Sequence, residues 1–390
     1  MADYKQSQYY IGLMSGTSID SLDGCICDFN GGYKLVSTAS YTWRKDEAEL
    51  LHSLCTPSYN ELEKAGEASN LIAKASSKVV SSLLDKANLK STDIIAIGSH
   101  GQTVRHCPQK GFSIQLDNPA LTAFLTNIDV VSNFRACDLA QGGEGAPLTP
   151  IFHKKLFSSK ERCRFVLNLG GISNLTVLDT NGEIICGFDC GPANTLIDLV
   201  ARSLINEKCD KDAKHAFLGK VRLEWLEDLL SHPYLKLDPP KSTGRETFNQ
   251  DFIREYLLLC SAYPQYTNDL FATLSEYSVL CVVNALRKIM YKNSYLDGEL
   301  ILCGGGARNP YFIKRFNELL KPCNIEVMTM NDLGIEEDYL EAMSFAYFAK
   351  TSIENEKLDL RRVTGACDLE IIGSISKANY GYHFRTSKVL

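Results

Sequence analysis

Apolar and polar positions follow two patterns along this chain, one typical of helices and one typical of short strands. Between Asn60 and Asn88, apolar residues recur at intervals of three and four, which predicts an amphipathic helix. The run Asp93–Ile97 then predicts a short buried strand, and Gly98–Thr103 predicts a polar loop after it. Helix, buried strand and polar loop in this order indicate an α/β fold, in which ligands bind at the loops that follow the strands.

The same patterns predict further elements in the second half of the chain. A buried strand is expected at Glu299–Cys303, opening into the glycines of Gly304–Gly306. Further helices are expected at Asn194–Ile205, Leu270–Met290, Tyr311–Leu320 and Tyr339–Ile353.

Two segments, one in each half, consist of an apolar strand, a turn of small residues and a second apolar strand. The first is Tyr10–Cys27 and the second is Arg164–Leu178, so each predicts a β-hairpin. The tip of the first offers backbone N–H groups, the hydroxyls of Thr17 and Ser18, and the carboxylate of Asp20. Such a tip can bind an anion and a divalent cation together, as a nucleotide triphosphate requires. An ordinary surface hairpin would show the same residues, and that alternative stays open.

Composition limits the classes of function. The 390 residues, 45% of them hydrophobic and 23% charged, indicate a soluble globular protein of two to three domains. A net charge of −6 argues against nucleic acid or an anionic membrane as the main partner. No apolar stretch approaches the roughly 20 residues of a membrane span. The N-terminus lacks the pattern of a signal peptide, so a cytoplasmic location is expected.

The 14 cysteines do not form a metal-binding pattern, because the sequence contains no Cys-x-x-Cys pair. Cys25 and Cys27 alternate with apolar positions, and Cys186, Cys281 and Cys303 lie singly in apolar runs. We therefore expect reduced thiols that behave as small hydrophobic side chains. The sequence also lacks a P-loop, the protein-kinase signatures, a dinucleotide-binding Gly-x-Gly-x-x-Gly and a Gly-x-Ser-x-Gly elbow.

Asp189 is the strongest candidate for a catalytic group. It follows the apolar residues Ile184 and Ile185 and precedes a turn at Gly191-Pro192, with a helix expected from about Asn194. A carboxylate held at a strand end can act as a general base. It could instead only satisfy the N–H groups of the turn. Structural roles are expected for other titratable side chains, namely Asp198, His100 and His106.

Nine segments in order along the chain resemble the anhydro-N-acetylmuramic acid kinase family. This family is a branch of the superfamily that contains sugar kinases, acetate kinase, actin and the heat-shock chaperone ATPases. The matching segments are Gly12–Asp20, Ser99–His106, Phe134–Asp138, Gly142–Leu148, Asn168–Asn174, Phe188–Asn194, Lys241–Asn249, Gly304–Pro310 and Glu341–Ala346.

The resemblance implies a two-lobed actin-like or ribonuclease H-like ATPase fold, with mixed sheets flanked by helices and a central cleft. Residues 1–135 would form the N-terminal lobe, joined by the C-terminal segment 363–390. Residues 136–362 would form the C-terminal lobe. The family's dimers make a homodimer the expected assembly.

The resemblance also implies a reaction in which water opens a 1,6-anhydro sugar and ATP phosphorylates O6, with Mg²⁺ required. Asp189 matches the family's catalytic base and also a substrate-binding position. Three further positions match sugar contacts: Arg135, Glu341 and Gln102. Asp20 is the expected Mg²⁺ ligand. The expected ATP-binding residues are Ser15, Gly16, Thr17, Ser18, Ile19, Asp20, Ser21, Leu22, Asn168, Gly170, Gly171, Gly304, Gly305 and Asn309.

Several positions depart from the family's usual residues. Ser21 replaces a glycine in the phosphate turn, and Cys190 replaces a threonine directly after Asp189. The other departures are Asn133, Glu144 and Ala193. The changes beside Asp189 and Arg135 border the sugar site, so an activity like that of levoglucosan kinases on another anhydro sugar stays open. A glycosidase that does not use ATP and a non-catalytic sugar sensor are the alternatives from other classes.

Overall fold

The computed structural model describes residues 8–244, 247–335 and 339–378, and these form two compact units. Unit 1 comprises Met1–Gly145, Tyr339–Arg361 and Gly365–Leu390, and unit 2 comprises Ala146–Asp338 and Arg362–Thr364. The expected lobes have other boundaries than these units, because residues 136–145 and Tyr339–Arg361, both expected in the C-terminal lobe, belong to unit 1. Part of the expected C-terminal segment, 379–390, and two residues of the Lys241–Asn249 segment, Arg245 and Glu246, lie outside the described residues.

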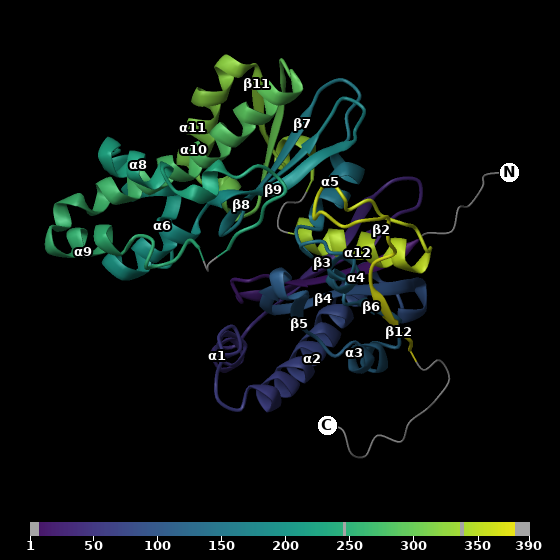
Figure 1. Cartoon of the computed structure of the whole chain (residues 1–390). Helices are drawn as coiled ribbons and strands as arrows, with labels where there is room; N and C mark the ends of the chain where they lie inside the picture. Colours follow the sequence, from purple (N-terminus) through teal and green to yellow (C-terminus); the bar gives the residue numbers. More distant parts are fainter. Residues whose placement is uncertain (1–7, 245–246, 336–338, 379–390) are drawn as a thin grey trace. The chain divides into compact units, whose positions relative to one another are not determined.

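Unit 1 is built on a seven-stranded mixed sheet with the order β12-β6-β4-β1-β2-β3, and β5 pairs with β4 beside this path. Figure 1 labels strands of this sheet, among them β2, β4, β6 and β12. Strand β1 pairs antiparallel with β2 and parallel with β4, so the first predicted hairpin is confirmed. The strands are β1 (Tyr9–Ser15), β2 (Ser21–Asp28), β3 (Lys34–Thr42), β4 (Ile94–Cys107), β5 (Phe112–Leu116), β6 (Val130–Ser132) and β12 (Ser374–Ser376).

Helices cover both faces of this sheet. A Cβ atom on Gly24 would meet Val79 and Leu83 of α2, whereas one on Gly12 would lie 1.8 Å from the carbonyl oxygen of Ala342 in α12. Successive strand residues point to opposite faces, and Gly24 pairs with the neighbour of Gly12, so α2 and α12 lie on opposite faces. The helices of unit 1 are α1 (Lys45–Ser53), α2 (Glu61–Ala87), α3 (Pro119–Thr126), α4 (Arg135–Ala140) and α12 (Leu340–Ile353).

The five-stranded sheet of unit 2 repeats the strand order of unit 1. Its order is β11-β10-β7-β8-β9, with β7, β8 and β9 antiparallel and with β10 and β11 added in parallel. The second predicted hairpin, β7–β8, therefore has the same place in its sheet as β1–β2. The strands are β7 (Arg164–Leu169), β8 (Ile172–Leu178), β9 (Ile184–Pro192), β10 (Gly298–Cys303) and β11 (Ile325–Thr329).

The long helix α10 forms the centre of the unit 2 core. The helices of this unit are α5 (Thr149–Phe157), α6 (Thr195–Val200), α7 (Lys214–Leu218), α8 (Leu223–Leu230), α9 (Arg254–Ala262), α10 (Thr267–Asn293) and α11 (Pro310–Leu320). The expectation that no stretch approaches membrane-span length was wrong, because Pro264–Asn293 is long and apolar enough. Within the apolar 18-residue window of this stretch, 83% is buried, as expected for a core helix.

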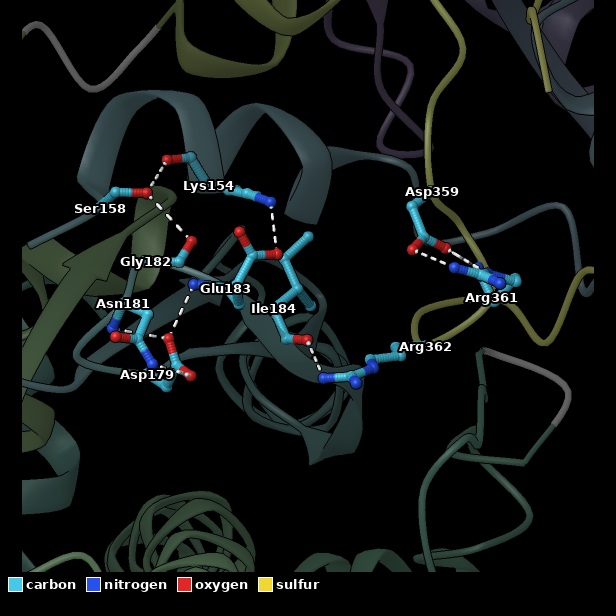
Figure 2. Close-up of polar contacts among 10 residues, drawn as sticks. All are labelled: Lys154, Ser158, Asp179, Asn181, Gly182, Glu183, Ile184, Asp359, Arg361 and Arg362. Carbon is cyan, nitrogen blue, oxygen red and sulfur yellow. Dashed lines mark hydrogen bonds and ion pairs between the residues drawn. The ribbon is translucent and has the colours of Figure 1, made fainter. Parts of the chain in front are cut away.

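The turn between β8 and β9 shows how polar contacts hold the edge of unit 2 (Figure 2). The Asp179 carboxylate accepts hydrogen bonds from the backbone N–H groups of Asn181 and Glu183, each at 2.8 Å. Glu183 pairs with Lys154 of α5 at 2.6 Å. These contacts fix the start of β9, the strand that carries Asp189.

The sequence predictions for most elements are confirmed to within a few residues, as for α2, α10, α11, α12 and β10. Two local predictions were wrong. Gly98–Thr103 is part of the long strand β4 and not a loop. The strand continues because the C-terminal part of β4, Gln102–Cys107, pairs with β5. Gly191-Pro192, predicted to form a turn after Asp189, is part of β9, so Asp189 lies within the strand and not at its end. Cys281 and Cys303 are buried as predicted, whereas Cys186 is only partly buried.

Candidate functional site

The tip of the β1–β2 hairpin presents polar side chains outward on a strained turn. Ile19 has φ 58°, a left-handed conformation that is rare for a β-branched residue and costs about 1–3 kcal/mol. Its side chain is buried in the unit 1 core, and its N–H donates to the Gly16 carbonyl oxygen at 3.1 Å. Thr17, Ser18 and Asp20 are exposed. Burial of Ile19 therefore holds a turn whose exposed groups can bind phosphate and a cation.

The remaining polar and apolar residues of the predicted phosphate turn are buried or only partly exposed. Ser15 and Leu22 are each 1% exposed, so Leu22 can contact a ligand only through its backbone. The Ser21 hydroxyl, at the position where the family usually has glycine, donates to the Asp23 carboxylate at 3.0 Å. Gln102 is fully buried, and its amide bonds to the hairpin and not outward.

A guanidinium group is held beside a neutral imidazole in the same unit. Arg135, the first residue of α4, donates from Nη1 to the Gly145 carbonyl oxygen at 2.6 Å, and its Nη2 lies 3.0 Å from His100 Nε2. His100 Nδ1 lies 2.9 Å from the Gly101 carbonyl oxygen, so Nδ1 carries the proton and Nε2 accepts from Arg135. Burial and the Arg135 charge lower the pKa of His100 to about 3.

The surroundings of Arg135 shift the pKa of its guanidinium group in opposite directions. Burial lowers the pKa of Arg135 to about 10, and the carboxylate of Glu341 acts in the opposite direction. Glu341 lies in the first turn of α12, four residues before Phe345, whose ring packs 4.7 Å from His100. Arg135 Nε is buried and has no hydrogen-bond partner among the described residues. The structure thus brings two predicted sugar-binding residues, Arg135 and Glu341, into one electrostatic group.

In unit 2, the β7–β8 turn lies against the glycine-rich turn that follows β10. A Cβ atom on Gly304, which has φ 80°, would lie 2.2 Å from Asn168 Oδ1, so only glycine fits this approach. Gly305 is exposed and has open space beside it. Asn309 caps α11 by accepting from the N–H groups of Tyr311 and Phe312. Its amide oxygen is therefore used within the fold.

The carbonyl groups of the β7–β8 turn hold the start of α6. The Asn194 side chain donates to the Gly170 carbonyl oxygen at 2.7 Å, and the Ala193 N–H donates to that of Gly171 at 2.9 Å. Gly171 itself is exposed, whereas Gly170 is partly exposed. The two glycines are therefore the part of this hairpin that a ligand can approach.

Asn174 and Thr243 both donate N–H groups to the Asp189 carboxylate within the described part of the chain. Its Oδ1 accepts from Asn174 Nδ2 at 2.8 Å across the β8–β9 ladder, and its Oδ2 accepts from the Thr243 N–H at 2.9 Å. Its backbone is also fixed, because its N–H donates to the Lys241 carbonyl oxygen at 3.1 Å and Tyr234 donates to its carbonyl oxygen at 2.8 Å. Donors of this kind favour the ionised form of a carboxylate.

Three of the side-chain contacts in these groups were not predicted from the sequence. Asn174 belongs to the segment Asn168–Asn174 that resembles the family. Its position opposite Asp189 follows from the antiparallel pairing of β8 with β9. Thr243 comes 54 residues after Asp189, so nothing local in the sequence indicates their contact. His100 was expected to be structural, but it contacts the guanidinium of Arg135.

Two units with the same strand order, each with a β-hairpin at the same place in its sheet, define the actin-like class of ATPases that includes the sugar kinases. The comparisons with known proteins give the family. The family model for anhydro-N-acetylmuramic acid kinase matches residues 8–378, and the chain belongs to that family.

Relatives of this name are similar over nearly the whole chain. The anhydro-N-acetylmuramic acid kinase of Pseudomonas syringae pv. tomato is 41% identical over 372 residues, which cover 95% of this chain and 99% of the relative. That of Nitrosomonas europaea is 39% identical over 375 residues, covering 95% and 100%. That of Shewanella pealeana is 39% identical over 378 residues, covering 96% and 100%.

Proposed function

We propose that this protein is an ATP-dependent kinase that opens 1,6-anhydro-N-acetylmuramic acid and phosphorylates O6, giving N-acetylmuramic acid 6-phosphate and ADP. The family membership supports this proposal, as do the names of relatives at about 40% identity over nearly the whole chain. The observation that carries the chemistry is the Asp189 carboxylate, oriented by Asn174 and Thr243. The activity would serve the recycling of cell-wall amino sugars.

In the proposed reaction, Asp189 accepts a proton from a water molecule as the water oxygen bonds to C1 of the sugar. The C1–O6 bond breaks, and its electron pair stays on O6. O6 then bonds to the γ-phosphorus of ATP, and the bond from that phosphorus to the bridging oxygen of ADP breaks. Because the phosphoryl group captures O6, no separate acid is needed to protonate the leaving oxygen, in contrast to inverting glycosidases.

Residues of both hairpins suit the phosphate groups of ATP. Thr17 and Ser18 expose hydroxyls at the first turn, and Gly171 is exposed at the second. The exposed Asp20 carboxylate is the residue that would hold Mg²⁺, and carboxylate oxygen is the ligand type this ion prefers. When bound, Mg²⁺ neutralises charge on the phosphates. Gly304 and Gly305 would lie against adenosine, and Asn309 would support them as a helix cap.

Arg135 favours a sugar that carries a carboxylate. A guanidinium group binds carboxylates with two parallel hydrogen bonds, and the Nε of Arg135 lacks a partner among the described residues. The lactyl group of N-acetylmuramic acid supplies a carboxylate, whereas levoglucosan has none. Arg135 and Glu341 are thus the proposed sugar contacts. A homodimer, which the family resemblance implies, and a cytoplasmic location, which the N-terminal sequence indicates, remain predictions.

An assay of ADP production with a panel of anhydro sugars tests this function. We expect turnover with 1,6-anhydro-N-acetylmuramic acid, a product with the mass of the 6-phosphate, and much slower turnover with levoglucosan. A preference for levoglucosan would reassign the substrate, and sugar hydrolysis that does not depend on ATP would indicate a glycosidase. Binding of the sugar without turnover by folded protein would indicate a sensor.

A further inference from the structure

We propose that Gln102 is a positioning residue that fixes the shape of the first phosphate turn, acting with Ser15 and Trp43, and that it does not touch the sugar. The proposal rests on the proposed function, because that function assigns the turn to the phosphates of ATP. It replaces the sugar contact that the family resemblance implies for Gln102. Ser15, Trp43 and Gln102 all lie in unit 1.

Both ends of the Gln102 amide are bonded within the fold. Its Oε1 accepts from the Ser15 hydroxyl at 2.6 Å, and its Nε2 donates to the carbonyl oxygens of Gly16 and Thr103, each at 3.2 Å. Ser15 and Gly16 are the first two residues of the phosphate turn, and Ser15 is also the last residue of β1. The amide of Gln102 therefore connects β4 to the point where the chain leaves β1.

The orientation of this amide is determined by its surroundings. Two carbonyl oxygens face Nε2, and a flipped amide would place its oxygen against both of them. The Trp43 indole Nε1 donates to Ser15 Oγ at 3.3 Å, so the single hydroxyl proton of Ser15 remains for Gln102 or for the Ser21 carbonyl oxygen. The contact to Gln102 is the shorter of the two, so the Ser15 hydroxyl donates its proton to Gln102 Oε1.

Burial prevents these side chains from reaching a ligand directly. Gln102 is 0% exposed, Ser15 is 1% exposed and Trp43 is 6% exposed. The next turn residues, Thr17 and Ser18, are exposed. The three buried residues thus lie beneath the turn. They can affect ATP binding only through the shape of the turn.

A bulge in β4 brings Gln102 to this position. Leu13 pairs with Ser99 and Ser15 pairs with Gln102, so β4 has one residue more than β1 in this interval. Gly101, with φ 74°, lies in that interval, and a Cβ atom there would be 2.4 Å from the Leu116 carbonyl oxygen. The bulge leaves the Gln102 side chain beneath the turn while His100 contacts Arg135.

The decisive variant is Gln102→Glu, which keeps an acceptor for Ser15 and places a second oxygen against the carbonyls of Gly16 and Thr103. We expect the Kd of ATP, measured by calorimetry without sugar, to rise roughly 10-fold to 100-fold. The KM of ATP should rise similarly, while the KM of the sugar and the kcat at saturating ATP change much less. Gln102→Met, which removes the bonds without adding charge, should act in the same direction.

Gln115→Glu is the matched control, because it makes the same chemical change on the neighbouring strand β5, where Gln115 donates to Thr103 Oγ1 at 3.1 Å. It should leave ATP binding unchanged. Ser15→Ala should also weaken ATP binding, and its effect should not add to that of Gln102→Met, because both remove the same hydrogen bond.

Three outcomes would overturn the proposal. Unchanged ATP affinity in folded Gln102→Met protein would show that the amide does not set the turn. A selective rise in the KM of the sugar would make Gln102 a sugar ligand, and additive effects of Ser15→Ala and Gln102→Met would indicate that Ser15 contacts ATP directly. Gly16→Val separates these results from the proposed function: if it leaves ATP binding unchanged as well, the assignment of the whole turn is wrong.

Discussion

At the scale of single residues, the surroundings of Asp189 make a clean chemical test possible. Its Oδ2 accepts from a backbone N–H, while its Oδ1 accepts from the side-chain amide of Asn174. Asn174 Oδ1 has no hydrogen-bond partner among the described residues, so this side-chain amide can flip, exchanging its oxygen and nitrogen, without losing another hydrogen bond. An asparagine at 189 could then accept from Thr243 and donate to Asn174, and the local structure would be kept.

We therefore predict that Asp189→Asn folds normally and binds ATP and sugar with affinities near those of the wild type. Asparagine cannot accept a proton at neutral pH, so turnover should fall by roughly 10²–10⁴-fold. Thermal unfolding, calorimetry and steady-state kinetics measure these three properties. Asp198→Asn, the same change in the first turn of α6, is the control and should keep its activity. A folded Asp189→Asn enzyme within tenfold of wild-type turnover would contradict the proposed base.

His153 gives a second prediction at this scale. Its ring is 1% exposed in unit 2, where Nδ1 lies 2.9 Å from the Thr176 hydroxyl oxygen, and burial lowers the pKa of His153 to about 3. In the unfolded chain the imidazole takes up a proton near pH 6.5, so below this pH the unfolded state binds more protons. The contribution of His153 to stability is full above pH 6.5 and is lost as the pH falls towards 3.

We predict that His153→Asn, which can keep the bond to Thr176, reduces the pH dependence of stability. Each buried neutral histidine adds a slope of about 1.4 kcal/mol per pH unit below its unfolded pKa. Urea unfolding of wild type and variant between pH 7 and 5 measures the difference in slope, whatever the variant's stability at neutral pH. Equal slopes would mean that His153 is protonated in the folded protein.

At the scale of secondary-structure elements, two glycines of the first hairpin region should respond in opposite ways to substitution. A side chain on Gly12 would collide with the α12 backbone, 1.8 Å from the Ala342 carbonyl oxygen, whereas one on Gly16 would meet only Ser18 Oγ at 3.8 Å. We predict that Gly16→Val folds with near wild-type stability but loses ATP affinity roughly 100-fold, because the side chain separates the turn from the phosphates.

Gly12→Ala provides the contrast, since it should lower the free energy of unfolding by about 1–3 kcal/mol or more through overpacking. Chemical denaturation and calorimetry on both variants distinguish the two effects. A Gly16→Val protein that is folded and binds ATP as tightly as the wild type would remove the hairpin from the nucleotide site.

Periodicity predicted the elements well but could not predict how strands continue or which distant segments meet. The amphipathic pattern determines α2 almost to the residue, because its apolar stripe packs on one sheet face. The polar residues of Gly98–Thr103 suggested a loop, yet they form strand because β5 pairs with the outer half of β4. Asp189 could be chosen from its context, whereas Thr243 and the burial of Gln102 depend on tertiary contacts that no local pattern contains.

At the scale of the whole molecule, the proposed reaction combines hydrolysis of the intramolecular glycosidic bond between C1 and O6 with phosphoryl transfer, and isotope labelling can separate the two. Water bonds to C1, whereas the oxygen between sugar and phosphorus is the original O6. In ¹⁸O-labelled water, we therefore predict that the new label appears on C1 of the product and not in its phosphate group.

Mass spectrometry of the product fragments at early times would locate the label. Because the C1 hydroxyl of a free sugar exchanges with water, the 6-phosphate incubated alone in labelled water gives the background rate, and labelling during turnover must exceed it. Label in the phosphate released would instead show that water attacks phosphorus, as in simple ATP hydrolysis. A sugar 6-phosphate that gains no label at C1 above background would mean that C1 is not opened by water, and Asp189 would then have no proton to accept in the manner proposed.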